Sequence, residues 1–511
     1  MSEWLGKSPK DSRMGVYRKI SAVFIGLCFM IPCLGDAEEI DTVGLTPSQK
    51  VYSLSLVEVS KLALDNNLDI QIAKFEASIA QTDEEKVGVV YDMMFEGEVG
   101  YQKDKNEKTS TILGTKSLTN DYNIGLIQNF PTGTNVSVDL TNRRNFSNSS
   151  FTTSPLTHES SLVFTFEQAL GKNFLGIQDR GKIKVTQLEV GNRQYTSLDK
   201  IEQILARVQR AYWDMVLYKE RKQIEENMVA MAKRLYDLNQ EKLREGLTEL
   251  PDAIAAEVNY RNQKNHLKAV RNLSRSKMNV LKLLLDQTDE NVVVVPTDSL
   301  NTVGGQENYP DSLKKAFGQR RDFKSIQNEV HASDIQLSME KNNLWPQINL
   351  KASLARNSLG DHFPDSVEGI TGEDHPDFFS GITVQVPIQN TQARAQLKAQ
   401  QWQKAKVLVG MKLLEKKIVI EVTDQVRDCN ILKEIADEDE LIAALQAQKL
   451  VEEEKRFNRG RSNTDTVIRF QEDLIQARWA AAQSKYNYLV SLVDLRVMEA
   501  SLLNEYWPGK F

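Results

Sequence analysis

Two long stretches of the chain carry apolar residues at intervals of three and four, the spacing that places side chains on one face of a helix. In the later stretch, residues 388–507, the apolar stripes are Val419, Val422, Val426, Cys429, Leu432 and Ile435 before a polar turn, and Val467, Phe470, Leu474, Ala477, Ala481 and Tyr488 after it. The stretch contains no proline, and Gly460 lies in the turn. We predict a helical hairpin whose first arm, of about 68 residues, spans roughly 100 Å. A hairpin this long needs partner helices, from the same chain or from others.

An equivalent hairpin is predicted in the first half of the chain. Residues 182–245 and 252–285 have helical patterns, and Gly246 and Pro251 separate them. The apolar stripe of the first arm comprises Ile201, Ile204, Val208, Ala211, Met215 and Tyr218. Such stripes are seams between packed helices. The methionine and aromatic positions therefore require no cofactor.

Alternation of apolar or small residues with polar ones predicts six strands. The segments are residues 95–101, 122–130, 136–140, 162–166, 348–355 and 378–386. Long polar loops are expected at residues 104–120, 141–157 and 356–377, and a tight turn at residues 131–133. Alternating segments with loops that are long on one side and short on the other are typical of an outer-membrane barrel. Two small soluble sheets are the alternative interpretation.

The two halves of the chain are related by an internal repeat. The recurring positions are Ala63 and Ala316, Asp69 and Asp322, Ile70 and Phe323, Glu76 and Glu329, and the turn glycines Gly246 and Gly460. Between the opening repeat and the turn glycine the first half is longer, and the additional residues fall among the predicted strands. The first half is therefore expected to contain one additional hairpin.

The first residues of the chain have the pattern of a secretory signal peptide. Two basic residues precede the apolar run 20–34, and residues 35–37 are Gly-Asp-Ala, a small-residue cleavage site. Cys33 follows Met-Ile-Pro, which fits a lipoprotein signal poorly. Removal of residues 1–37 leaves Cys429 as the one remaining cysteine, so no intramolecular disulfide is expected.

Composition and motifs favour a protein without catalysis. The formal net charge of −6 does not favour a nucleic-acid partner. Neither a phosphate-binding glycine loop nor a Gly-x-Ser-x-Gly motif occurs. Of the five histidines, only His362 and His375 lie close in sequence, in a loop with Asp361, Asp365, Glu373, Asp374 and Asp377. Histidine and carboxylates are suitable metal ligands, but a solvated acidic loop is the simpler interpretation. We predict no enzyme activity, cofactor, metal ligand or catalytic residue.

Taken in order, these features resemble the TolC-type outer membrane efflux protein family over nearly the whole mature length. The segments that carry the resemblance are the duplicated opening helix, Leu-Trp-Pro-Gln-Ile-Asn-Leu at 344–350, Val-Gln-Val-Pro-Ile at 384–388, its first-half counterpart Phe-Glu-Gln-Ala-Leu at 166–170, and the turns Glu-Gly-Leu at 245–247 and Arg-Gly-Arg at 459–461. The resemblance implies a mixed α and β fold: a trimeric outer-membrane β-barrel continued by a periplasmic α-helical coiled-coil tunnel, with two structural repeats per chain.

The implied function is an outer-membrane exit duct of a tripartite efflux or type I secretion system. Its partners would be two further copies of the chain, outer-membrane lipid, a periplasmic adaptor protein and an inner-membrane transporter that supplies the cargo. A periplasmic coiled-coil adaptor or scaffold that does not span the membrane is the alternative. The predicted organisation is a signal peptide (1–37), an N-terminal linker (38–51), a first repeat (52–285), a connector in the belt around the middle of the tunnel (286–311), a second repeat (312–504) and a C-terminal tail (505–511).

The additional hairpin is a departure from the family pattern of two strands per half. It predicts six strands per subunit and eighteen per trimer, unless the hairpin folds outside the barrel.

The resemblance also implies roles for the two turns. Candidates for the periplasmic gate are Asp252, Arg459, Arg461, Asp465 and Arg469, and candidates for adaptor contact are Gly246, Leu247, Gly460 and Arg461. The alternative for these polar residues is an ordinary helix end. Asp465 in particular lies near a helix start, where a carboxylate can cap the helix and complement its dipole. The two roles are compatible.

Overall fold

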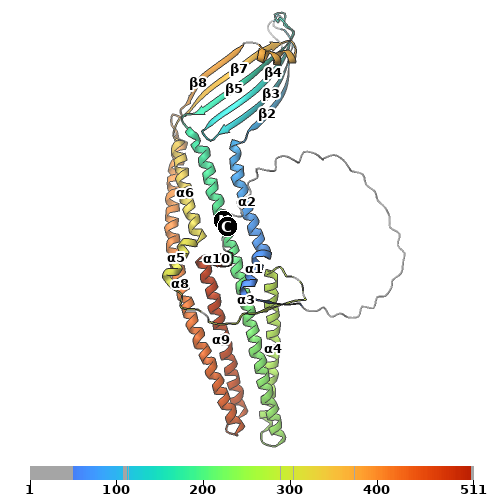
Figure 1. The fold of residues 1–511 in the computed structure, drawn as a ribbon, viewed down its shortest axis with the longest axis vertical. Coiled ribbons are helices and arrows are strands. Elements are labelled where there is room, and N and C mark those ends of the chain that lie inside the picture. The colour runs from blue at the N-terminus through green and yellow to red at the C-terminus, as the bar shows by residue number, and fades with distance from the viewer. Residues whose placement is uncertain are drawn as a thin grey trace, which may run out of the picture. The chain divides into compact units, whose positions relative to one another are not determined.

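The computed structural model describes residues 50–106, 112, 114–287, 289, 291–302, 304–372 and 375–507 (Figure 1). The predicted signal peptide lies outside the described residues. The chain forms two compact units: the first contains the described parts of 1–72, 199–320 and 418–511, and the second contains those of 73–198 and 321–417. Each unit is described by itself below.

Two helical hairpins dominate the helical part of the chain. In the first, α3 (Ile177–Arg244) is followed by α4 (Leu250–Leu284); in the second, α8 (Thr391–Asn458) is followed by α9 (Thr464–Met498). Both hairpins combine a 68-residue helix with a 35-residue helix. The predicted hairpins are therefore confirmed. Among the described residues, no helix has both the length and the apolar character required to cross a membrane.

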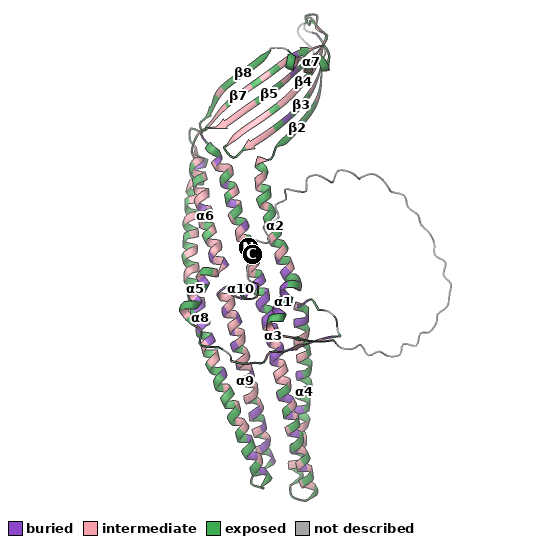
Figure 2. Ribbon diagram, in the orientation of Figure 1, coloured by how far each residue is buried: buried purple, intermediate pink, exposed green. Residues whose placement is uncertain are grey.

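The predicted helix stripes are largely buried (Figure 2). On α3, Ile201 and Val208 are 1% and 0% exposed. On α8, Val422 and Cys429 are fully buried, but the predicted stripe residues Val419 and Ile435 are 36% and 45% exposed. The second-half stripe is thus narrower than predicted, because a 3.6-residue helix drifts away from a strict spacing of three and four over several turns.

The first unit contains five further elements, two before the first hairpin, two between the hairpins and one after the second. They are β1 (Lys50–Leu54), α1 (Leu56–Asn66), β6 (Val292–Pro296), α5 (Tyr309–Gln319) and α10 (Leu502–Tyr506). β1 and β6 pair in parallel as a two-stranded sheet. β1 begins inside the predicted N-terminal linker, so sequence reasoning missed this strand. Ser55 ends it and begins α1 through a capping box with Glu58.

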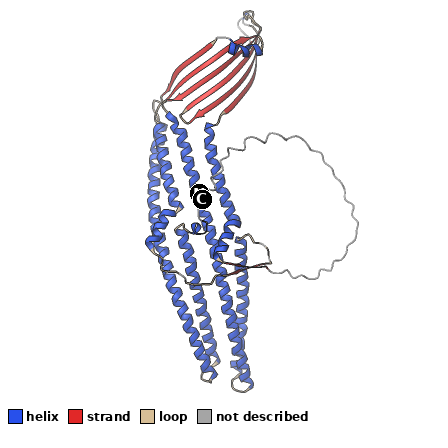
Figure 3. Ribbon diagram, in the orientation of Figure 1, coloured by secondary structure: helices blue, strands red, loops and turns tan. Residues whose placement is uncertain are grey.

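The second unit contains a single six-stranded antiparallel sheet (Figure 3). Its strands are β2 (Met94–Asp104), β3 (Ser117–Phe130), β4 (Thr134–Ser147), β5 (Leu156–Ala169), β7 (Gln347–Gly360) and β8 (Pro376–Gln385), adjacent in that order. Its other elements are most of α2 (Leu68–Gly88), the short helices η1 (Val89–Tyr91) and η3 (Phe174–Gly176), α6 (Arg321–Asn342), α7 (Phe363–Gly372), and parts of α3 and α8.

All six predicted strands are confirmed as members of this one sheet. The additional first-half hairpin is β3–β4, and it lies between β2 and β5 rather than apart from the sheet. The predicted loops are wrong in extent: β4 continues to Ser147, β7 continues to Gly360, and α7 occupies much of the segment that we expected to be loop. Strand ends rich in Asn, Arg and Ser pair through their backbones, which side-chain alternation does not reveal.

Candidate functional site: the sheet faces and the hairpin tips

One face of the sheet is apolar across all six strands. Because alternate residues of a strand point to opposite faces, the pairing of the strands assigns each residue to a face. One row across this face consists of Phe95, Leu126, Val138, Phe164, Leu354 and Phe378. These six side chains are between 36% and 71% exposed. An exposed apolar patch of this extent on a single chain marks a surface that contacts lipid or protein.

The opposite face is polar and acidic. Its acidic residues are Glu96, Glu98, Asp104, Asp121, Asp139, Glu159, Glu167 and Asp377, and its basic residues are Arg143 and Lys351. Arg143 forms an ion pair with Asp121 at 2.8 Å. Asn349 donates a hydrogen bond to Glu167 at 2.6 Å. This composition is suited to contact with water, whereas the apolar face is suited to contact with lipid or protein.

The two edge strands of the sheet are open. β2 and β8 each pair with one neighbour, which leaves the other side of each strand without a strand partner in the described chain. Both edges expose large apolar residues; Val99 on β2 is 79% exposed and Ile382 on β8 is 63% exposed. Long, apolar, unprotected edges favour pairing with another chain.

α7 covers the polar end of the apolar face. Ser366 of α7 is fully buried, and its hydroxyl lies 2.8 Å from that of Ser160 on β5. Asn142 of β4 donates to both hydroxyls, at 2.7 Å and 3.3 Å. The prediction of a solvated loop in this segment is therefore wrong, because much of the segment forms the packed helix α7. Glu373 and Asp374 of the weighed metal site lie outside the described residues, and the described residues contain no group of three or more metal-ligating side chains.

Two glycines end the long helices in the same geometry. Gly246 and Gly460 have φ values of 72° and 70°, a left-handed conformation that favours glycine. In each turn the amide of the following residue donates back over the last helical turn, from Leu247 to Lys242 at 2.8 Å and from Arg461 to Arg456 at 2.9 Å. This is the Schellman motif, which stops a helix sharply. Leu247 is 71% exposed at the first tip.

The two tips lie together in the first unit. The ammonium group of Lys242 at the end of α3 lies 3.9 Å from the ring centroid of Phe457 at the end of α8. Behind the tips, Thr464 of α9 donates to Asn239 of α3 at 3.0 Å. A buried apolar cluster supports them: Leu235, Ala256, Leu450, Phe457, Val467 and Leu474. The structure thus brings both sets of predicted tip residues to one end of the unit.

The predicted gate residues differ in their contacts within the described chain. Asp252 accepts a hydrogen bond from Thr248 at 3.3 Å, and the guanidinium of Arg469 lies 5.6 Å from the ring centroid of Phe470. Arg459, Arg461 and Asp465 are exposed, and within the described chain the structure gives them no ion-pair partner. Their charges are therefore available to other molecules or to further copies of the chain.

The helix cap near the second turn is not Asp465. Asn463 is the N-cap residue of α9, and its side chain accepts from the amide of Thr466 at 2.9 Å. Asp465 lies in the first turn, where its charge complements the helix dipole without capping. Sequence reasoning also missed Glu453, a buried carboxylate of α8 that pairs with Arg456 at 3.1 Å and accepts a hydrogen bond from Ser462. The only signal for Glu453 is its spacing of three residues from Arg456.

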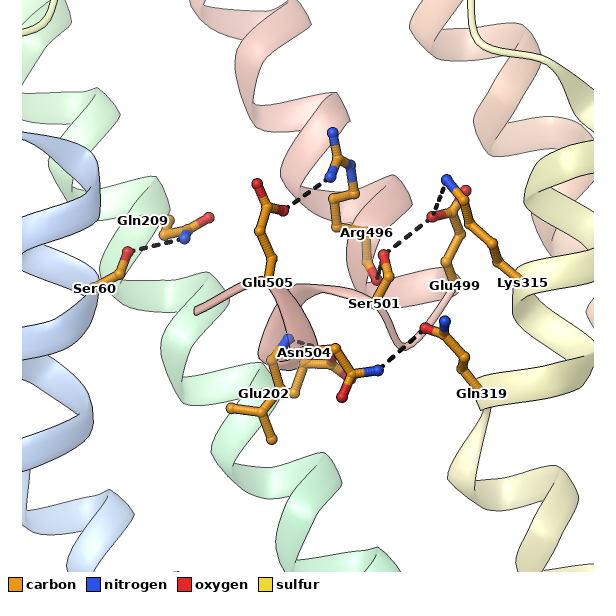
Figure 4. A network of polar contacts seen from close by, with 11 residues as sticks. Ser60, Glu202, Gln209, Lys315, Gln319, Arg496, Glu499, Ser501, Asn504 and Glu505 are labelled. Atoms are coloured by element: carbon orange, nitrogen blue, oxygen red, sulfur yellow. Dashed lines mark hydrogen bonds and ion pairs between the residues drawn. The ribbon is translucent and has the colours of Figure 1, made fainter. Parts of the chain in front are cut away.

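A polar network surrounds α10 in the first unit (Figure 4). The buried Glu202 of α3 accepts from the amide of Leu503 at 3.0 Å, and Asn504 donates to Gln319 of α5 at 3.3 Å. Arg496 of α9 pairs with Glu505 at 2.8 Å. These contacts connect the C-terminal residues to three other helices.

The connector between the halves crosses α8. Thr302 donates to Asp437 at 2.9 Å, and the amide of Glu307 donates to Asn430 at 2.9 Å. Thr302 and Glu307 are therefore held on the side of α8 by polar contacts.

Two helices have apolar stripes that remain exposed in the part of the chain that the structure describes. On α2 the stripe is Leu68, Ile72, Phe75 and Ile79, which are 56% to 65% exposed. On α8 it is Trp402, Val409, Leu413 and Ile420, which are 61% to 69% exposed. The spacings of three, four and seven place each set on one side of its helix. Such stripes are the seams through which helices of other chains pack.

Solved structures share this fold. The CusC protein, whose structures concern folding and transmembrane channel formation, is similar with a TM-score of 0.65 at 13% identity, over 90% of this chain and 95% of that one. The CmeC outer membrane channel of Campylobacter jejuni has a TM-score of 0.60 at 13% identity, over 92% and 94%. The open MtrE outer membrane channel of Neisseria gonorrhoeae has a TM-score of 0.63 at 12% identity, over 93% and 99%.

No protein-family model and no curated protein sequence matches the chain. The resemblance to the TolC-type proteins is confirmed at the level of the fold, because these structural neighbours are outer membrane channels of that type.

Proposed function

We propose that this protein is a trimeric outer-membrane exit duct that conducts cargo passively and without catalysis. The observation that carries the proposal is the sheet: it is apolar and exposed on one face, acidic on the other, and open at both edges. The apolar face would contact outer-membrane lipid and the acidic face would line a water-filled passage. The shared fold with outer membrane channels supports the same function.

Three copies would close the sheet into one barrel of eighteen strands. β2 and β8 run in opposite directions, so β8 of one copy can continue the antiparallel order on β2 of the next. Closure would remove every open edge. A barrel of 16 to 18 strands encloses an aqueous channel. The apolar stripes of α2 and α8 would pack between copies at the same time.

In this proposal the chain serves a tripartite efflux or type I secretion system. The helical hairpins of three copies would form a periplasmic tunnel, and an adaptor protein would join the tunnel to an inner-membrane transporter. Two observations support it: the hairpins have matched lengths, and both tips lie at one end of the first unit with exposed side chains.

Cell fractionation tests the duct against the periplasmic scaffold. The duct is expected in the outer-membrane fraction, to be extracted only by detergent, and to migrate differently in gels before and after heating. Release of the full-length protein by osmotic shock would refute the duct and favour the scaffold.

The exposed tips are expected to touch the adaptor. Cysteines introduced as Leu247→Cys and Arg461→Cys should crosslink to it in cells, because Leu247 and Arg461 follow the two turn glycines and are exposed. Native Cys429 is buried and should give little background. Asn301→Cys, in the exposed connector, is the matched control. Crosslinks through residue 301 alone would contradict tip contact.

Loss of tip carboxylates is expected to open the periplasmic entrance. If three tips converge, closure requires neighbours of opposite charge, and Asp465 and Asp252 are the candidate carboxylates for Arg459 and Arg461. An exposed ion pair contributes about 0–1 kcal/mol, so three equivalent pairs contribute up to about 3 kcal/mol. Asp465→Ala should therefore raise single-channel conductance in planar bilayers, and the double variant with Asp252→Ala should raise it further.

The matched control for the gate is Asn463→Ala. It removes the helix cap, at a cost of about 1 kcal/mol in helix stability, without changing charge. Equal conductance changes for Asn463→Ala and Asp465→Ala would assign the effect to the helix start. Unchanged conductance in intact trimers of the double variant would place the constriction elsewhere.

A further inference from the structure

The acidic residues of the six strands are confined to one face of the sheet. The apolar face carries Lys103 on β2, Arg144 on β4 and Arg356 on β7, and none of the six described strands places an acidic residue on it. All eight acidic residues of the described strands lie on the opposite face. The charged strand residues on the apolar face are therefore all basic.

On each of these three strands the cation lies beyond an apolar residue of the same face, toward the loop end of the strand. On β2, Lys103 is two residues beyond Tyr101, and on β7, Arg356 is two residues beyond Leu354, so each is separated from the last apolar side chain by roughly 7 Å. Arg144 follows Leu140 on β4 after the buried Asn142. All three occupy the loop end of the sheet, where β2 continues to β3, β4 to β5 and β7 to β8.

A fourth cation belongs to the same group. Lys116 immediately precedes β3, and its ammonium lies 5.7 Å from the ring centroid of Phe146. Phe146 lies two residues beyond Arg144 on β4, and therefore on the apolar face. We name these four residues, Lys103, Lys116, Arg144 and Arg356, the basic collar.

The collar residues remain available to a ligand. Lys103 and Arg356 are exposed. Arg144 is half-buried and donates one hydrogen bond to the side chain of Asn120 at 3.3 Å, which leaves further guanidinium donors. α7 carries the exposed carboxylates Asp365 and Glu368 and packs on β7, so Arg356 should contribute less than the other three.

We infer that the basic collar binds the phosphate groups of a lipid headgroup, and that four cations in one group fit a headgroup with two phosphates, the diphosphoryl glycolipid lipid A, better than a headgroup with one. This inference rests on the proposed function, in which the apolar face is in the bilayer and the long helices are in the periplasm. The loop end of the sheet, at which the strands do not continue into those helices, would then be at the outer surface. Cations just beyond an apolar belt lie at headgroup depth. Arginine and lysine form charge-assisted hydrogen bonds to phosphate oxygens.

The test measures lipid binding to the detergent-purified full-length protein by native mass spectrometry. The probes are diphosphoryl lipid A, dephosphorylated lipid A and phosphatidylglycerol. Wild type should bind diphosphoryl lipid A most tightly. The triple variant Lys103→Gln, Lys116→Gln, Arg144→Gln should bind it roughly a hundredfold more weakly, at about fivefold for each cation removed.

Lys351→Gln is the matched control, because Lys351 lies on β7 but on the acidic face. It should bind diphosphoryl lipid A like wild type. Equal binding by the triple variant and wild type, an equal loss in Lys351→Gln, or a preference for phosphatidylglycerol would each overturn the assignment.

An assay of incorporation into vesicles distinguishes a failure of the proposed function from a failure of the inference that the basic collar binds lipid. Wild type and the triple variant should both insert into phosphatidylcholine vesicles, because the apolar face is unchanged. Failure of wild type to insert would overturn the proposed function and the collar together, whereas insertion without phosphate-dependent lipid binding would overturn the collar alone.

Discussion

Replacing Phe164 by arginine is expected to abolish assembly of the protein in the outer membrane. Phe164 lies on β5 in the central row of the apolar face and is 47% exposed in the chain. Arginine on the lipid face near the middle of a bilayer costs about 2–4 kcal/mol. Three copies per trimer bring the cost to about 6–12 kcal/mol, comparable to the whole stability of a typical domain. Heat-modifiable migration of the outer-membrane fraction measures the loss.

The neighbouring residue supplies the control. Thr165 follows Phe164 on β5 and belongs to the acidic face, so Thr165→Arg would place the same side chain in the aqueous passage. This variant should assemble at close to wild-type levels. Equal loss in the two variants would mean that β5 tolerates no bulky change, and normal assembly of Phe164→Arg would show that the apolar face does not contact lipid.

Placing aspartates in the apolar stripe of α2 is expected to separate the copies. Ile72 and Phe75 are 56% and 65% exposed in the single chain, and their burial between copies would contribute about 1.5–3 kcal/mol for each side chain. The double variant Ile72→Asp, Phe75→Asp should therefore lose about 3–6 kcal/mol at each of three interfaces. Size-exclusion chromatography with light scattering in detergent should then report smaller species than the wild-type trimer.

The control for this variant is Gln81→Asp. Gln81 is exposed on α2 but lies about 150° around the helix from the centre of the stripe, at 100° per residue. It should leave the oligomer unchanged. A double variant that retains the wild-type mass would show that the stripe of α2 is not an interface between copies.

The hairpins could be predicted because their signals are local. Helical spacing, the absence of proline, and Gly246 and Gly460 at the turns act within a few residues of one another, and both glycines adopt the left-handed conformation that ends a helix. The six strands could be predicted because one of their faces is apolar, which produces alternation.

Elements stabilised by distant contacts could not be predicted. α7 contains three residues typical of loops, Pro364, Gly369 and Gly372, and becomes a helix against β5 and β7 by burying Ser366 and Ile370. β1 exists because it pairs with β6, more than two hundred residues later. In both cases tertiary packing outweighs local preference.

The candidate site was likewise predictable only where its signals are local. The tip residues could be located from the turns, but the choice between neighbouring polar residues could not: Asn463 rather than Asp465 accepts the capping hydrogen bond. Glu453 was missed because its burial depends on Ser462 across the turn. The basic collar needs the register of the strands, since a shift of one residue would place each cation on the other face.

The most direct test of the account is an electron cryomicroscopy structure of the detergent-extracted protein. The account predicts three copies around one axis, with eighteen strands in a single closed barrel, β8 of each copy paired to β2 of the next, Phe164 on the outside and Thr165 on the inside. Chains that remain separate, a sheet that closes within one chain, or an apolar face packed against protein instead of detergent would contradict it.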